Sequence, residues 1–281
     1  MTRPGGGVPG GSVPVGQAPG AAVIVRRLGG PFRAAALRTA ADRGGLVVTV
    51  VFFLIVSVVL SGLWRAAAGP SGSVVGYTAG DLTWYAFTAE AAVCSIDIRL
   101  IERVGEDISG GLVAVEMLRP LPVVAVRLAV ETGQALARLV GLVAVGVPVA
   151  WLIAGPPPAA VGALVAVPSL VLGVATNLAA QHIVASAAFW LRDVRAVWFL
   201  YQKTVFLLGG MLLPLEVLPG ALQAVAVAGP FMAMAYAPAR AAAGHATAWL
   251  PLAQLGWLVL LTAAAVFVFD RGQRRLEVVG G

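Results

Sequence analysis

The longest uncharged stretch does most to limit what this chain can fold into. Residues 139–191 contain no Asp, Glu, Lys or Arg over 53 positions. At about 1.5 Å per residue, one helix of that length would far exceed the roughly 30 Å hydrocarbon layer of a membrane. Three consecutive prolines at 156–158 interrupt the stretch, and proline ends helices because it lacks a backbone donor. The stretch therefore predicts two membrane spans, at 133–154 and 160–190.

The composition also indicates a membrane protein. Only 11% of the 281 residues are charged and the mean hydropathy is +0.92, whereas soluble domains carry about 25% charged residues. The basic residues recur between apolar blocks instead of forming one patch, so the net charge of +6 does not indicate nucleic-acid binding. A single cysteine and two distant histidines exclude an intrachain disulfide and the usual zinc spacings.

Four further spans complete the predicted architecture, at 44–64, 81–98 (with Asp81 as N-cap), 196–213 and 248–269. Residues 214–245 are apolar but broken by four prolines, so they could form a seventh span or a re-entrant hairpin. Six spans place 17 of the 19 Lys and Arg residues on one side, whereas a seventh would put the basic C-terminal tail outside. We therefore predict an all-α integral membrane protein with six transmembrane helices, cytoplasmic termini and an extracellular-side re-entrant hairpin.

The N-terminal region is predicted as two parts. Residues 1–25 are rich in Gly and Pro and read as a disordered tail. In residues 26–43, arginines alternate with apolar residues from Pro31 onward, which favours an amphipathic helix on the cytoplasmic membrane surface over a solvated basic arm. The transmembrane domain then covers 44–270, and a cytoplasmic tail covers 271–281.

The sequence lacks the motifs of several enzyme classes. A Walker A loop needs Lys directly after Gly, and the only lysine, Lys203, follows Gln202. Neither a Gly-x-Ser-x-Gly elbow nor a His-Glu-x-x-His helix is present. We therefore expect a chain that does not hydrolyse ATP and binds no cofactor itself.

Two sequence segments point to a known family. One is ISGGLVAVEMLRPLP at 108–122, in the charged loop after the second predicted span. The other, in 190–238, contains WLRDVRA, PLEVLPGAL and GPFMAMAYAP. With the six-span layout, these blocks resemble the membrane subunit of a type 2 ATP-binding-cassette (ABC) exporter.

The resemblance implies partners and a mode of action. Two permease chains, identical or related, would associate with two ABC ATPase subunits, which would bind ATP and magnesium. Substrate, of the drug, natural-product, lipid or glycan class, would leave the cytoplasm between the permeases, and the protein would reside in the cell's inner or plasma membrane. The loop 99–131 would hold a coupling helix that docks on the ATPase.

We expect that coupling helix within 104–118, with turns at Gly105, Gly110 and Gly111 and an end set by Pro120 and Pro122. Its pattern gives an apolar face with a charged rim, as a partner site needs, although a helix lying on the membrane shows the same pattern. The residues assigned to ATPase coupling are Glu106, Asp107, Ile108, Leu112, Val115, Leu118 and Arg119.

Polar residues inside the predicted spans are the other candidates. Glu90 could line the substrate pathway, paired with Arg138, or form a structural ion pair, because an unpaired carboxylate in a membrane is costly. Asn177 and Gln181 could contact substrate, but interhelical hydrogen bonding is the favoured role. A second pattern, Arg127 and Glu131, suggests a local helix pair.

Two other function classes stay open at this point. One is a non-transporting membrane enzyme or assembly scaffold. The other is an ion-coupled carrier that uses Glu90 and Asp97, although no internal repeat of the kind found in carriers is evident.

Overall fold

The computed structural model describes residues 21–118, 121–191 and 193–279, and these are almost entirely helical. A two-stranded antiparallel hairpin pairs Ser73 with Thr78 and Val74 with Tyr77. In chain order the elements are α1 (Ala21–Ala41), α2 (Arg43–Ala68), η1 (Gly69–Ser71), β1 (Ser73–Val74), β2 (Tyr77–Thr78), α3 (Ala79–Cys94), α4 (Leu100–Ser109), α5 (Leu112–Glu116), α6 (Val123–Ala154), α7 (Ala160–Ala185), η2 (Ser186–Phe189), α8 (Arg195–Leu208), η3 (Leu215–Val217), α9 (Gly220–Ala228), η4 (Pro230–Ala233), α10 (Tyr236–Ala242) and α11 (Trp249–Val279).

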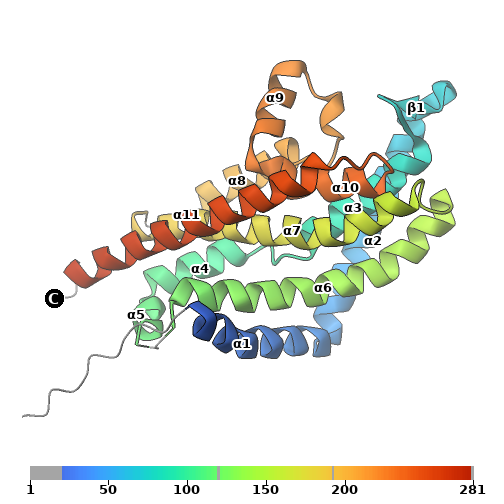
Figure 1. Cartoon of the computed structure of the whole chain (residues 1–281). Helices are drawn as coiled ribbons and strands as arrows, with labels where there is room; N and C mark the ends of the chain where they lie inside the picture. The colour runs from blue at the N-terminus through green and yellow to red at the C-terminus, as the bar shows by residue number, and fades with distance from the viewer. Residues whose placement is uncertain (1–20, 119–120, 192, 280–281) are drawn as a thin grey trace, which may run out of the picture.

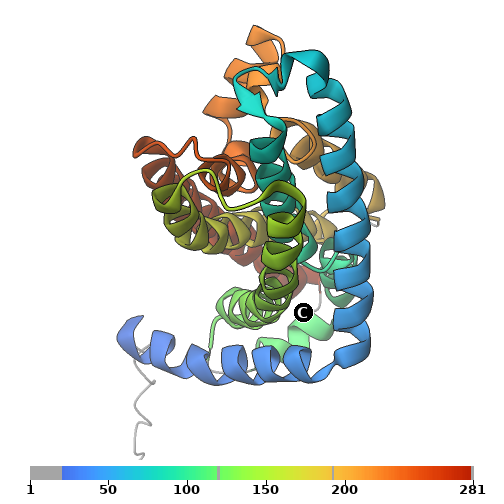
Figure 2. The same ribbon diagram turned by 90° about the vertical axis from the view of Figure 1, so that its right-hand side faces the viewer.

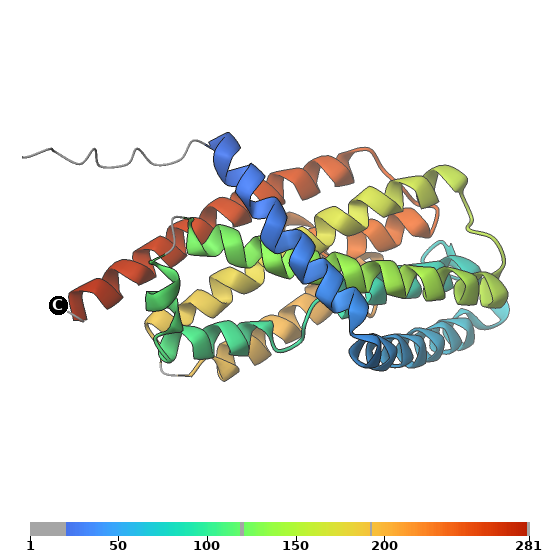
Figure 3. The same cartoon turned by 90° about the horizontal axis from the view of Figure 1, so that it is seen from below.

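The long helices define two ends of the molecule. In Figure 1, α5, the start of α6 and the C-terminal end of α11 gather at one end, which we call the charged end. The β1–β2 hairpin and the α6–α7 connection lie at the opposite end, and Figure 3 shows the same separation from below. The loops predicted on the two sides of the membrane are thus separated in space.

Within the described residues, four helices are long and apolar enough to cross a membrane: α2, α6, α7 and α11. These correspond to predicted spans at 44–64, 133–154, 160–190 and 248–269, although α6 begins ten residues earlier, at Val123. The other two predicted spans correspond to α3 and α8, which have only 16 and 14 residues. At about 1.5 Å per residue these reach roughly 24 and 21 Å, so the count of six spans stays a prediction.

The region 214–245 forms short pieces. Helix α9 has nine residues and α10 has seven, so neither crosses a membrane alone. In Figure 1, α9 projects from the body formed by α7, α10 and α11. The re-entrant placement of this region stays a prediction.

Two predicted helix starts are wrong. Residues 21–25 were predicted as part of a disordered tail but belong to α1. This helix was expected to begin at Pro31, which instead lies inside it. Residues 1–20 lie outside the described residues. The N-cap of α3 is Thr78, and Asp81 is instead its partner three residues on in a reciprocal capping box. Helix α11 continues through the predicted tail to Val279.

Helix α1 packs against α6 and joins the lower end of α2 (Figure 2). Asp42 separates the two helices, because its side chain caps α2 by accepting a hydrogen bond from the backbone N–H of Gly45 (3.1 Å). The close contact with α6 requires Gly133, where a Cβ would lie 2.4 Å from the Phe32 carbonyl oxygen.

Candidate functional site

The predicted coupling segment forms two helices instead of one. Gly111 adopts a φ of +78°, a backbone conformation that favours glycine, so the chain turns between α4 and α5. Gly105 does not supply a turn; it lies inside α4, where a Cβ would meet the side chain of Val194 at 2.6 Å. Helix α4 therefore packs closely onto the α7–α8 connection, and α5 lies beyond it at the charged end (Figure 1).

The predicted apolar face is mostly exposed. Leu112, Val115 and Leu118 are 48%, 61% and 85% exposed. Ile108 is the exception: it is 3% exposed and packs in the core, so it cannot contact a partner directly. In the charged rim Glu106 is exposed and Asp107 is half-buried, while Arg119 lies outside the described residues. The surface formed by Leu112, Val115 and Leu118 is called the α5 apolar surface below.

Arg127 joins three helices at the charged end. Its Nη1 lies 2.9 Å from Oδ2 of Asp107 in α4, and its Nε lies 2.8 Å from Oε2 of Glu116 in α5. The predicted local pair of Arg127 with Glu131 is therefore wrong, because both carboxylate partners of Arg127 come from the loop. The guanidinium fixes α4 and α5 to the first turns of α6.

A second arginine makes a parallel connection. Arg103 of α4 pairs with Asp97, just after α3, and its Nη2 lies 2.7 Å from Oε1 of Glu131 in α6. Burial lowers the pKa of the Arg103 guanidinium, but the carboxylates of Glu131 and Asp97 outweigh burial and hold that pKa above its usual value. Arg103 therefore stays charged, and α3, α4 and α6 are linked beside the Arg127 site.

Glu90 lies in the interior of the bundle. Its side chain is fully buried, so it does not face lipid, as the cost of a lipid-facing carboxylate predicts. Its Oε2 accepts a hydrogen bond from the Cys94 thiol, with Sγ 3.6 Å away, and its Oε1 has no hydrogen-bond partner among the described residues. The predicted pair with Arg138 is not formed; Arg138 instead donates to the Ser95 carbonyl at 3.2 Å.

Asn177 and Gln181 take part in a contact between helices. The Asn177 Oδ1 accepts hydrogen bonds from the Tyr201 hydroxyl of α8 (2.7 Å) and from Gln181 Nε2 (3.1 Å). The Tyr201 bond connects α7 to α8, which is the interhelical role favoured from the sequence for Asn177, whereas the bond of Gln181 stays within α7.

A polar cluster at the opposite end has no local signal in the sequence. Glu216 Oε1 accepts hydrogen bonds from the hydroxyls of Tyr77 (3.0 Å) and Tyr236 (2.7 Å), and Arg240 donates to the Tyr236 hydroxyl (3.1 Å). These residues join β2, η3 and α10. Because Tyr77 and Glu216 are 139 positions apart, only the folded chain brings them together.

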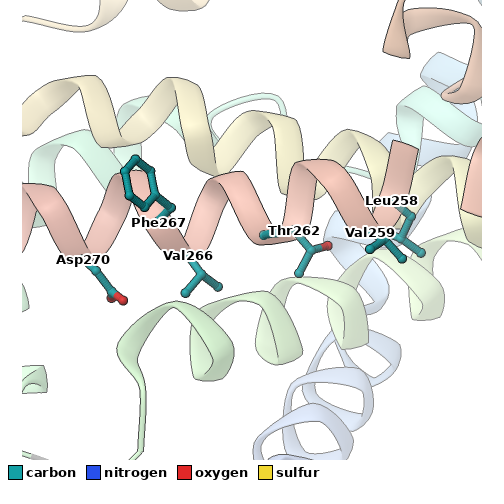
Figure 4. Close-up of a pocket in the computed structure, with 7 residues that line it drawn as sticks. Leu258, Val259, Thr262, Val266, Phe267 and Asp270 are labelled. Carbon is teal, nitrogen blue, oxygen red and sulfur yellow. The ribbon is translucent and has the colours of Figure 1, made fainter. Parts of the chain in front are cut away.

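An open apolar groove of about 680 Å³ follows α11. Figure 4 shows Thr262, Val266 and Asp270 pointing toward α6, while Phe267 points away. All seven lining residues belong to α11, so the groove is a helix surface and not an enclosed binding site. Within the described residues, no three His, Cys, Asp or Glu side chains come together in a way that could hold a metal ion.

Comparison with known proteins identifies the family. The model of the family described as "ABC-2 family transporter protein" matches residues 46–280, most of the chain and nearly all of its helical body. A search of curated proteins gave no match. This family comprises membrane transport components that are not themselves catalytic, and membership implies association with a membrane and with an ABC ATPase. The chain belongs to the ABC-2 transporter family and is a multi-pass membrane permease of an ABC transporter.

Proposed function

We propose that this chain is the membrane permease of an ATP-driven exporter and that α5 is its docking site on a separate ATPase subunit. The ATPase would bind ATP and magnesium, and a second permease chain, identical or related, would complete the pathway. The substrate would belong to the drug, natural-product, lipid or glycan class. The supporting observation is the α5 apolar surface, which is exposed at the charged end of a chain of this family.

The proposed orientation places the charged end in the cytoplasm. Six spans, with α3 and α8 as the short ones, then leave both termini on the cytoplasmic side of the cell's inner or plasma membrane. The basic residues of α1 and of the α11 end support this orientation through the positive-inside rule.

The proposed mechanism is mechanical. Closure of the ATPase on ATP would displace α5, and Arg127 would transmit that displacement to α6 through contacts of 2.8 and 2.9 Å. Ion pairs that are mostly shielded from water hold their partners more firmly than exposed pairs do, because water and salt screen them less. The α4–α5 unit would therefore move with α6 as one body.

The test is copurification of the tagged chain from its host in mild detergent. The ATPase is identified by its Walker A peptide. The double variant Leu112→Asp with Leu118→Asp should no longer transport substrate or copurify the ATPase, while the amount of chain in the membrane stays unchanged. Val75→Asp is the control, because it also puts an aspartate in place of an exposed apolar residue (55%), but at the opposite end. Normal transport and copurification in the double variant would show that the ATPase docks elsewhere.

A further inference from the structure

The only lysine of the chain lies on an unusual surface. Lys203 is exposed in the third turn of α8, eight residues after Arg195. At about 1.5 Å per residue, Lys203 lies roughly 12 Å along the helix from Arg195. If α8 is the fifth span, the ammonium lies near the middle of the membrane.

The surroundings of Lys203 are aromatic and aliphatic. Its Nζ lies 5.2 Å from the ring centroid of Phe199 and 5.9 Å from that of Phe206, both on the same helix face. Leu200 and Leu207 are exposed beside it. The rings stabilise a cation, but no carboxylate among the described side chains pairs with Lys203.

Lipid does not suit this surface. A lysine facing hydrocarbon at mid-membrane costs about 3 kcal/mol or more, and such residues usually face a water-filled cavity or a partner. A second copy of the chain does not suit it either. Of the acids described in α3, α6 and α11, Glu90 and Glu131 are buried, while Asp81 lies in the first turn of α3 and the exposed Asp270 lies just beyond the predicted span 248–269.

From this inventory we infer that Lys203 binds the negative group of the transported substrate, whose apolar body lies against Phe199 and Phe206. The substrate would be an amphipathic anion, with a carboxylate, sulfonate or phosphate at one end of an apolar skeleton. This inference rests on the proposed transport function, since it assigns α8 to the substrate pathway. It narrows the proposed substrate to those members of the four chemical classes that carry an anionic group on an apolar skeleton.

The test measures binding to the full chain in nanodiscs of phosphatidylcholine, with no ATPase and no ATP. The probe is 11-(dansylamino)undecanoic acid at neutral pH, compared with its carboxamide, which differs only in charge. Energy transfer from tryptophan to dansyl reports binding, and empty nanodiscs give the partition background. A charge-assisted contact of this kind should make the acid bind about tenfold more tightly than the amide.

Three variants separate the charge from the fold. Lys203→Gln should bring acid and amide to equal affinity, and Lys203→Arg should keep the preference. Arg195→Gln, an exposed cation on the same helix, should also keep it. Equal binding of acid and amide to the unmodified chain, or a preference that survives in Lys203→Gln, would overturn the inference.

A last comparison identifies the source of the anion. Adding phosphatidylglycerol to the nanodiscs should leave probe binding unchanged; if it displaces the probe, the ligand of Lys203 is a membrane lipid and the substrate assignment is wrong. Because the assay contains no ATPase, its outcome does not depend on the outcome of the Leu112 and Leu118 experiment. Loss of the ATPase site would leave the acid preference intact, and loss of the preference would leave copurification intact.

Discussion

Arg127→Met removes the guanidinium that joins α4 and α5 to α6. The Arg127 side chain is 11% exposed, while those of its partners Asp107 and Glu116 are 27% and 25% exposed. Breaking a fully buried ion pair costs about 3–5 kcal/mol, because the remaining charge is left without a partner. Since water reaches these carboxylates, we expect a smaller cost of about 1–3 kcal/mol for local opening of α5.

Hydrogen exchange measured by mass spectrometry on the detergent-solubilised chain reports this opening. A loss of 1–3 kcal/mol corresponds to about 5- to 150-fold faster exchange of amides that close only when α5 is folded. The Met117 N–H, which donates to the Val113 carbonyl at 3.0 Å, is such an amide. Amides in the middle of α7 should exchange at their original rate, because the change is local.

Arg195→Met is the matched control. Arg195 also pairs with an aspartate, Asp193, at 3.0 Å, but both side chains are mostly exposed. An exposed pair contributes about 0–1 kcal/mol, so exchange near it should rise by no more than about fivefold. Unchanged exchange of α5 in Arg127→Met, or an equal rise in α5 for both variants, would refute the claim that Arg127 fixes the α4–α5 unit.

Two further predictions concern other contacts. Glu216→Ala removes the acceptor of the Tyr77 and Tyr236 hydroxyls and should lower the free energy of unfolding by about 2–4 kcal/mol in denaturant titrations, while Glu216→Gln, which keeps an acceptor, should lose less. Equal losses for the two variants would contradict this role. Gly133→Ala places a Cβ 2.4 Å from the Phe32 carbonyl oxygen and should therefore speed amide exchange in α1. Gly256→Ala is the control, because its Cβ meets open space and should leave exchange in α1 unchanged. Unchanged exchange in α1 of the Gly133 variant would show that α1 accommodates the methyl group.

Apolar run length predicted the long helices well, because a membrane span is a local property of composition. The stretches at 44–64 and 160–190 correspond to α2 and α7 followed by η2. Helix ends were harder to predict, because they depend on which side chain reaches a free backbone N–H. Both Thr78 and Asp81 can cap a helix, and only the backbone geometry shows that Thr78 is the N-cap.

The site was predicted less completely, because its contacts join distant segments. The apolar pattern of 104–118 identified Leu112, Val115 and Leu118 as a surface, but the same periodicity included Ile108, which lies before the turn at Gly111 and packs in the core with the rest of α4. The i,i+4 spacing of Arg127 and Glu131 suggested a local pair. In the folded chain, longer-range partners compete successfully: Glu116 for Arg127 and Arg103 for Glu131.

Helix α6 is the element on which these contacts converge. It contacts α1 at Gly133, α4 and α5 through Arg127, α4 through Glu131, and the end of α3 through Arg138. Except for the glycine contact, each of these uses a charged side chain within the first 16 residues of a 32-residue helix. The second half of α6 has no charged side chain and reaches the opposite end of the molecule. In the proposed mechanism a displacement applied at α5 would act on α6 at one end, and α6 extends about 48 Å to the other.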